Sequence, residues 1–363
     1  MMNLLILQHM HKAFHISFFL FLVSCITPFD PDLTQENPKL SVEGTVTDLA
    51  GPYAIKLSYS TSYTSGDKKN ENTIRDAKVF ISDSEGNEEE LTYSGNAGTY
   101  VTAADGIQGV AGRYYTLRVE LSNGKAYESY PELMPHAPEI DTLYAEYRDV
   151  TGEFVQGEFD VYLDATDPAE EENYYLWKWK HYKRLDYCLT YVQNFPSPPT
   201  WYARYCCSEC FEIEACAGCV NIGSDALVNG GRISRVPLMS FEYDSREPYY
   251  LQAEQYSLTE SAYKFWKTAS DLINNAGGVF DKPPVTVKGN LFNVSDPNEQ
   301  VLGYFGASSV KVKAVYFRRD NIPSFPYSST PLYNIDTRGC QECEESIYRT
   351  ERKPSEWDNA PTY

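Results

Sequence analysis

Cysteines are the residues of this chain whose type and spacing could do chemistry. The sequence contains nine of them, and eight lie in two segments, residues 188–219 and 340–343. Six of the eight form C-x-x-C pairs, a spacing that tetrahedral zinc sites use, but an even number of cysteines also suits a set of disulfides. The eight are Cys188, Cys206, Cys207, Cys210, Cys216, Cys219, Cys340 and Cys343.

The ninth cysteine, Cys25, ends a short stretch that is first basic and then apolar. Lys12 precedes the run AFHISFFLFLVSC, which is too short to span a bilayer and is typical of a secretory signal. Its last four residues, Leu-Val-Ser-Cys, resemble the lipobox of bacterial lipoproteins. We therefore expect a signal peptide at residues 1–24, a lipid on Cys25 and a tether at residues 25–38. The alternative is a hydrophobic N-terminal strand with a buried cysteine.

The expected export of the protein favours disulfides over a zinc site for the eight cysteines. In an oxidising compartment thiols form disulfides before they can bind metal. The gap between Cys210 and Cys216 is also shorter than the usual span between the two halves of a zinc site. We predict disulfides and no cofactor, with zinc at the C-x-x-C pairs as the alternative. At least one bridge should reach Cys340 or Cys343, because the C-terminal tail would otherwise have little to hold it.

No catalytic site is indicated. Once the signal peptide is removed, His136 and His181 are the remaining histidines, too few for a multi-histidine metal site. Two groups of carboxylates could bind calcium or act as a glycosidase pair, but both fall where strands turn, and ordinary turn chemistry is the simpler interpretation. We predict that the protein is not an enzyme. The groups are Asp164, Asp167, Glu170, Glu171 and Glu172, and Asp296 with Glu299.

The charge balance excludes one class of partner. Lysine and arginine together number 31, aspartate and glutamate 51, and the net charge is −20. Such a field repels phosphate backbones, so we expect no nucleic-acid partner.

The elements that must position these residues are mainly β, in two β-sandwich-like domains. Residues 39–131 contain short alternating runs with turns at intervals of about eight to twelve residues, as in a sandwich. Pro131, Pro135 and Pro138 mark a linker. Residues 140–322 are expected to form the second β domain.

The second domain should carry one amphipathic helix, about residues 257–276. Ser257 and Glu260 have capping-box spacing, and the apolar residues that follow recur at steps of three and four, so one face must be buried. Residues 181–228 keep no such period and are expected to be a crosslinked excursion, a large cysteine-rich insertion. Residues 323–363 form a C-terminal tail.

Aromatic residues are the candidates for contact with a ligand or partner. Tyr and Trp offer large contact area at low entropic cost, and the excursion is rich in them. On another strand Tyr175, Trp177 and Trp179 share one face, but alternation with lysine favours a half-buried sheet strand over an aromatic platform. The candidate contact residues are Tyr191, Trp201, Tyr202 and Tyr205.

Several motifs together resemble known families. Residues 39–131 resemble transthyretin-like, carboxypeptidase-regulatory-like modules. The lipobox, E-N-Y-Y-L-W, the helix Y-S-L-T-E-S-A-Y-K-F-W, V-K-G-N-L-F-N with D-P-N-E-Q-V-L-G-Y-F-G-A-S-S-V, and the last C-x-x-C followed by K-P-S-E-W resemble a family of Bacteroidetes outer-membrane lipoproteins, a domain of unknown function often encoded beside TonB-dependent receptors.

The resemblance implies a lipid-anchored protein of the outer membrane that faces the cell exterior. It would capture a ligand, or act as an accessory partner, for a TonB-dependent transporter, without catalysis. The alternative is a structural or adhesive envelope lipoprotein. A surface hydrolase acting on glycans or peptides is a less favoured hypothesis and would need a carboxylate such as Asp164 or Glu299. The family supplies no catalytic residues that could be carried over.

Overall fold

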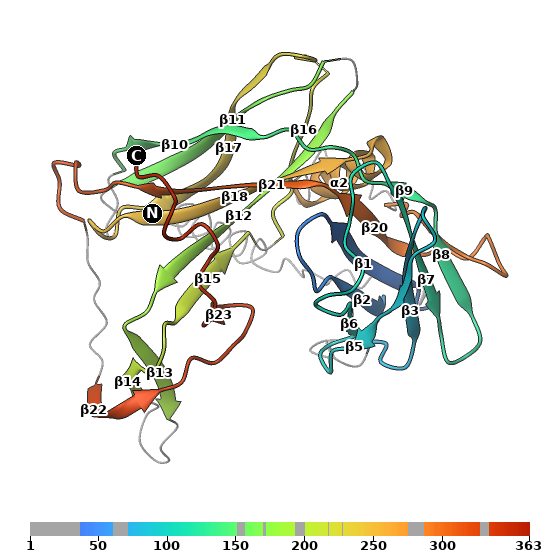
Figure 1. Cartoon of the computed structure of the whole chain (residues 1–363), viewed down its shortest axis with the longest axis horizontal. Helices are drawn as coiled ribbons and strands as arrows, with labels where there is room; N and C mark the ends of the chain where they lie inside the picture. The colour runs from blue at the N-terminus through green and yellow to red at the C-terminus, as the bar shows by residue number, and fades with distance from the viewer. Residues whose placement is uncertain are drawn as a thin grey trace, which may run out of the picture. The chain divides into compact units, whose positions relative to one another are not determined.

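The fold is mainly β, as predicted, and the helix α2 is the single helix of the described residues (Figure 1). Residues 38–363 form one unit, separate from residues 1–37. The lipidation site at Cys25 and the signal peptide lie outside the described residues. The computed structural model describes residues 37–60, 72–150, 157–169, 172–192, 200–216, 218–226, 228–274, 287–326 and 334–363.

The first sandwich has two sheets whose inner faces share one core. Their strand orders are β20-β1-β2-β6-β5 and β19-β8-β7-β3-β4, with β9 beside β7. Alternation builds the core, since Tyr115, Leu117 and Val119 of β7 are buried while the residues between them are partly exposed. The strands are β1 (Leu40–Thr47), β2 (Ala54–Tyr59), β3 (Lys78–Asp83), β4 (Glu88–Glu90), β5 (Thr92–Tyr93), β6 (Thr99–Val101), β7 (Tyr114–Glu120), β8 (Ala126–Ser129), β9 (Glu132–Leu133), β19 (Leu291–Asn293) and β20 (Leu302–Ser308).

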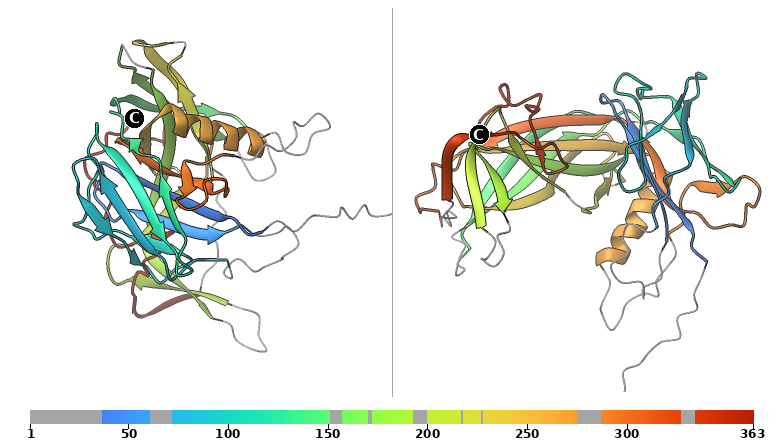
Figure 2. Two further views of the ribbon diagram at one scale, coloured as in Figure 1. Left: turned by 90° about the vertical axis from the view of Figure 1, so that its right-hand side faces the viewer. Right: turned by 90° about the horizontal axis from the view of Figure 1, so that it is seen from below.

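Two strands of this sandwich come from the segment after the helix. β20 pairs in parallel with β1 along its whole length, and β19 pairs antiparallel with β8; the orange and blue strands lie side by side in Figure 2. Gly303 in β20 has φ +86°, and a Cβ there would lie 1.9 Å from the carbonyl oxygen of Val42, so the approach of β20 to β1 requires glycine. Strands within residues 140–322 therefore complete the sandwich that residues 39–131 begin.

The second sandwich packs the sheet β10-β11-β17 against the sheet β21-β18-β12-β15-β23, in which β16 also pairs with β12. Tyr175 and Trp177 of β12 are 1% and 3% exposed, and Trp179 packs against the same core. The core interpretation of this aromatic strand is confirmed. The strands are β10 (Ile140–Arg148), β11 (Glu158–Thr166), β12 (Tyr174–Arg184), β15 (Phe211–Ala215), β16 (Asn221–Ser224), β17 (Arg232–Glu242), β18 (Tyr249–Leu258), β21 (Val310–Phe317) and β23 (Arg349–Thr350).

Helix α2 (Glu260–Asn274) follows β18 directly. Thr259 caps it, because its Oγ1 accepts the backbone N–H of Ala262 at 3.2 Å. The predicted capping box is wrong, since Ser257 still belongs to β18 and donates its hydroxyl to the carbonyl of Pro135 at 2.7 Å. The predicted helix end at residue 276 falls outside the described residues. Within the described part of the chain, no helix has the length and apolar character needed to cross a membrane.

The excursion, residues 181–228, is built largely of strands. β12 continues into it as far as Arg184, and β15 and β16 pair with β12. Strands β13 (Tyr187–Val192) and β14 (Thr200–Cys206) form a hairpin, and β22 (Asn334–Gln341) from the tail pairs in parallel with β14 (Figure 1). The prediction that the excursion is a large loop is therefore wrong. Its strands pair with β12 and with the tail, and such pairing between distant segments is not visible in a local sequence pattern.

Disulfides hold the excursion and the tail together, as predicted. Two of the four bridges, Cys207–Cys340 and Cys210–Cys343, join the excursion to the tail, which confirms the expectation of a bridge to the C-terminal cysteines. The other two, Cys188–Cys206 and Cys216–Cys219, lie inside the excursion.

The tail is also held by packing and by backbone hydrogen bonds. The ring of Trp357 lies 4.9 Å, centroid to centroid, from the rings of both Phe211 and Tyr250. The backbone of Tyr316 in β21 exchanges hydrogen bonds with the chain end, donating to Pro361 at 2.8 Å and accepting from Tyr363 at 2.9 Å. The tail is therefore an integral part of the second sandwich.

Candidate ligand groove

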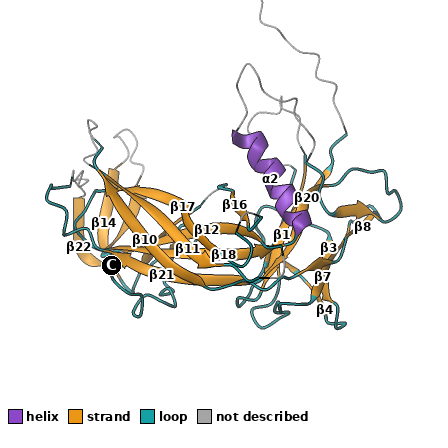
Figure 3. Ribbon diagram, turned by 90° about the horizontal axis from the view of Figure 1, so that it is seen from above, coloured by secondary structure: helices purple, strands orange, loops and turns teal. Residues whose placement is uncertain are grey.

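A groove lies between helix α2 and the outer face of the sheet that holds β1, β2 and β20. Its volume is about 690 Å³, within the range of about 300–1,000 Å³ that small-molecule sites usually have. Figure 3 shows α2 beside β20 and β1. The groove is assembled from the first sandwich, from β12 and from the helix, so distant parts of the chain are needed to make it.

Small residues make the floor of the groove. Gly44 and Ser41 of β1 and Gly303 and Gly306 of β20 line it, together with Thr45. Glycine within a strand often marks a place where a ligand or another backbone approaches closely. At Gly44 and Gly303 the close approach is that of the neighbouring strands, since a Cβ there would meet the side chain of Ile55 and the carbonyl oxygen of Val42.

Aromatic side chains make the wall that the helix contributes. Phe265 and Trp266 contact each other edge to face with ring centroids 5.3 Å apart, and Phe265 lies 5.0 Å from the ring of Tyr304. The apolar face of the helix thus has two uses: Ala262 is buried in the core, whereas Phe265, Trp266 and Ala269 line the groove. Half-buried aromatic rings of this kind can stack on a ligand.

Three charged residues give the groove its polar groups. Glu43 and Lys56 are exposed, and Lys178 of β12 is half-buried. The Lys178 Nζ lies 4.8 Å from the centroid of the Tyr256 ring, a cation–π contact. Burial lowers the pKa of Lys178, and the negative charges of Glu254 and Glu43 oppose that change.

The groove offers few groups for acid–base or nucleophilic chemistry. Among the described residues that line the groove there is one carboxylate and neither a histidine nor a cysteine, so an acid–base pair or an activated nucleophile is missing there. An apolar wall with a few placed polar groups is the usual composition of a ligand site. An amphipathic ligand, with a ring face and hydroxyl or charged groups, fits this composition.

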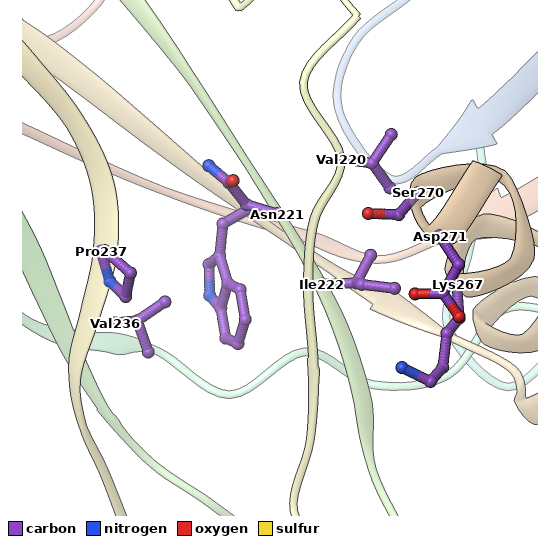
Figure 4. Close-up of a pocket in the computed structure, with 9 residues that line it drawn as sticks. Val220, Asn221, Ile222, Val236, Pro237, Lys267, Ser270 and Asp271 are labelled. Carbon is purple, nitrogen blue, oxygen red and sulfur yellow. The ribbon is translucent and has the colours of Figure 1, made fainter. Parts of the chain in front are cut away.

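A second, smaller pocket lies on the other side of the helix. It has a volume of about 320 Å³. Lys267, Ser270 and Asp271 of α2 face Ile222 of β16 across it, with Pro237 of β17 farther away (Figure 4). Helix α2 therefore separates two pockets, and the larger one carries the aromatic wall.

The aromatic candidates of the excursion do not all share one surface. Tyr191 and Trp201 are opposite each other in the β13–β14 register, but their side chains lie outside the described part. Tyr202 is partly buried, and Tyr205, 50% exposed, contacts Tyr187 with ring centroids 4.9 Å apart. Because Tyr202 and Tyr205 are three residues apart on one strand, they point to opposite faces of the hairpin.

The carboxylates that could have been catalytic are held by structural partners. Asp164 accepts from Arg232 at 2.7 Å and from the backbone N–H of Arg235 at 2.6 Å. Glu299 accepts from Lys125 at 2.9 Å and from the hydroxyl of Tyr127 at 2.9 Å. Glu299 lies in a turn, as predicted, whereas Asp164 lies within β11 and not where a strand turns.

His181 belongs to an aromatic stack. The ring of His181 is stacked on that of Tyr249, with centroids 3.8 Å apart. The ring of Tyr249 is also stacked on that of Phe241, again with centroids 3.8 Å apart. The His181 Nδ1 donates to the carbonyl of Tyr250 at 2.6 Å. Burial lowers the pKa of His181 to about 4, helped by the positive charges of Arg319 and Lys183. His136 is exposed.

We therefore expect His181 to make stability depend on pH. Its folded pKa lies below the unfolded value of about 6.5, so the unfolded chain takes up the proton first, and stability falls as pH drops from about 6.5 to about 4. With allowance for partial exposure the loss is about 2 kcal/mol. Urea denaturation at several pH values measures it, and His181→Phe, which keeps the stacking, should remove this part of the slope. An unchanged slope in that variant would contradict the assignment.

Sequence reasoning found the helix but missed the groove. Glu43, Lys56 and Lys178 carry no motif, and their neighbours in the groove come from other segments. The glycines of strands β1 and β20 are no signal for the groove, because at Gly44 and Gly303 it is the neighbouring strand that comes close.

The geometry defines a class: a disulfide-crosslinked protein of two β-sandwiches, with a groove beside the helix of the second. The chain belongs to the family described as a domain of unknown function (DUF4249), which matches residues 26–314. No curated protein matches it. A segment of two fibronectin type-III domains from chicken tenascin is similar over 62% of this chain and 92% of its own length, with 13% identity and a TM-score of 0.17. At that TM-score the likeness supports no statement about this chain.

Proposed function

We propose that this protein is a non-catalytic, lipid-anchored binding protein of the outer-membrane surface that captures a ligand for a TonB-dependent transporter. The groove between α2 and the first sandwich is the observation that carries the proposal. The lipobox ending at Cys25 and the motif resemblance support the membrane location and the transporter partner.

The groove favours an amphipathic ligand with at least one ring. Phe265 and Trp266 supply a stacking wall beside a floor of small residues. Lys178 and Glu43 can orient hydroxyl, amino or carboxyl groups at the rim. Sugars and short peptides with an aromatic or proline residue have this combination of features.

Replacing Trp266 with alanine should weaken binding in the groove by about tenfold or more, because one stacked ring contributes about 0.5–1.5 kcal/mol beyond its buried area. The probes are soluble oligosaccharides and short peptides, followed by intrinsic tryptophan fluorescence and calorimetry. Lys264→Ala is the matched control, since Lys264 is on the same helix, is exposed and lies outside the groove. Equal affinities of Trp266→Ala and wild type for every bound probe would place the site elsewhere.

The transporter partnership is tested in native membranes. Extraction in mild detergent and affinity purification should recover a barrel-forming receptor with the full-length protein. Recovery of the protein alone, under conditions that keep other receptor complexes intact, would count against the partnership. Gene deletion separates the remaining functions: loss of growth on one nutrient supports ligand capture, whereas a defect in attachment or envelope integrity supports a structural or adhesive role.

A further inference from the structure

Buried polar atoms without partners gather at one end of the second sandwich. In the described part of the chain four buried side-chain oxygens have no hydrogen-bond partner, and three of them are Oδ1 and Oδ2 of Asp225 and Oδ1 of Asn173. Asp225 is 1% exposed. Buried oxygens in this state are rare in folded proteins and need an explanation, such as a bound ion.

The two residues are neighbours in space. The backbone N–H of Asp225 donates to the carbonyl of Asn173 at 3.1 Å. Asp225 follows β16 and Asn173 precedes β12, and these two strands pair, with Ser224 opposite Tyr174. The two residues that carry the unpartnered oxygens are therefore neighbours at the end of one sheet.

A second carboxylate reaches the same place from the other sheet. Asp167 follows β11, is 2% exposed and lies beside the carboxyl group of Asp225. Its Oδ1 accepts from the hydroxyl of Tyr175 at 2.5 Å, and its Oδ2 accepts from the backbone N–H of Gly230 at 3.0 Å. Asp167 is thus held in position and still has free lone pairs.

Two adjacent buried carboxylates repel each other unless a positive charge lies between them. No described side chain donates a hydrogen bond to the carboxylate of Asp225. The charge that is missing here must come from a shared proton or from a cation.

We propose that Asp167, Asp225 and Asn173 bind a hard divalent cation, Ca²⁺. The donors are all oxygens, two from carboxylates and one from an amide, which is the donor set that Ca²⁺ prefers and which thiol- or imidazole-seeking metals do not. Water would complete the coordination. A proton shared between the two carboxylates leaves Oδ1 of Asn173 without a donor, whereas a cation can coordinate all three unpartnered oxygens.

The ion would join the two sheets of the second sandwich. Asp167 comes from the sheet of β11, and Asn173 and Asp225 flank strands of the sheet of β12. The turn that follows Asp225 is already tied to Asp167, because Gly230 donates to its carboxylate and the Asp167 N–H donates to the carbonyl of Gly231 at 2.9 Å. Ion binding therefore fixes a junction that includes the end of β16, one wall of the smaller pocket.

Thermal unfolding of the full-length protein, stripped with EDTA and then given millimolar Ca²⁺, tests the proposal. We expect the midpoint to rise by several degrees, since a ligand that binds only the folded state stabilises it. Tb³⁺ should bind in place of Ca²⁺ and luminesce on excitation of the nearby tyrosines. Mg²⁺ should bind more weakly, because it dehydrates reluctantly.

Asp225→Asn should weaken Ca²⁺ binding by about tenfold or more. Asp164→Asn is the control and should keep the wild-type response, because the carboxylate of Asp164 already accepts hydrogen bonds from Arg232 and Arg235. If Asp225→Asn does not fold, Asn173→Ala should show a smaller loss of affinity by Tb³⁺ titration. A wild-type midpoint that Ca²⁺ does not move, or a wild-type response in both Asp225→Asn and Asn173→Ala, would overturn the proposal. Neither result bears on the groove, whose ligand binding is measured separately.

Discussion

Replacing all four cysteines of the two bridges between excursion and tail with serine is expected to destabilise the protein by about 5 kcal/mol or more. Each bridge spans a sequence separation of 133 residues, and closing a loop of that length removes much of the entropy of the unfolded chain. Because the tail also packs through Trp357, the variant should still fold at low temperature, with a lower urea midpoint.

Removing one bridge alone should cost much less than half of that amount. Cys207–Cys340 and Cys210–Cys343 lie three residues apart in both segments, so when one is cut the other still closes the long loop. The two double variants, Cys207→Ser/Cys340→Ser and Cys210→Ser/Cys343→Ser, and the quadruple variant therefore form a strongly non-additive cycle. The pair Cys210–Cys343 is buried and its loss should be the larger of the two.

Urea denaturation of the four proteins measures this cycle. Cys216→Ser/Cys219→Ser is the matched control, because that bridge has a sequence separation of only 3 and its removal should change stability by less than about 1 kcal/mol. Additive losses for the two bridges would show that they act through local packing and not through closure of the long loop.

Replacing Glu132 with leucine should cost about 3 kcal/mol. Glu132 is 4% exposed and accepts hydrogen bonds from Thr259, from Tyr304 at 3.0 Å and from Asn290 at 3.4 Å. It therefore ties β9 to the cap of α2 and to β20. Leucine would leave these buried donors without an acceptor, and each such loss costs about 1–3 kcal/mol.

Glutamine at position 132 should be tolerated, since it keeps an acceptor and carries no charge. Burial raises the pKa of Glu132, although its three hydrogen bonds oppose the change. A raised folded pKa means that the folded state holds the proton longer, so this residue contributes stability at low pH that is lost as pH rises above about 4.5. Glu132→Gln should therefore be within about 1 kcal/mol of wild type at pH 7.

The measurement is urea denaturation at pH 5 and pH 7. Glu139→Leu, at an exposed site in the linker that follows β9, controls for the loss of a carboxylate and should change stability by about 0.5 kcal/mol or less. If Glu132→Leu were as stable as wild type, the contacts of Glu132 would not hold the helix cap and β20 in place.

Much of the local structure followed from the sequence alone. Alternation in β7 and β12 predicted strands, and it also predicted that Tyr175 and Trp177 are core residues, because a strand with one buried face must alternate. The three- and four-residue spacing around Phe265 predicted the helix. The exact start of the helix was missed, because contacts with the neighbouring β21 and linker decide that Ser257 stays in a strand and that Thr259 caps the helix.

The pairing of distant segments was decided by the tertiary structure. β20 joins β1, β22 joins β14, and Cys207 and Cys210 reach the tail. A strand pattern shows which residues face the core but carries no information about which edge the strand will pair with. For the same reason the hypothesis of disulfides could be made from the count of cysteines, while their connectivity could not.

The sequence by itself determined the mainly β class, the helix, the presence of disulfides and the lack of a recognisable catalytic motif, because these depend on residue type and local period. Only the tertiary structure decided the groove and the proposed Ca²⁺ site. Both are formed where chain segments far apart in sequence meet: Glu43, Lys178 and Trp266 at the groove, and Asp167 and Asp225 at the cation site. Their chemistry arises from burial and proximity, which the order of residues does not contain.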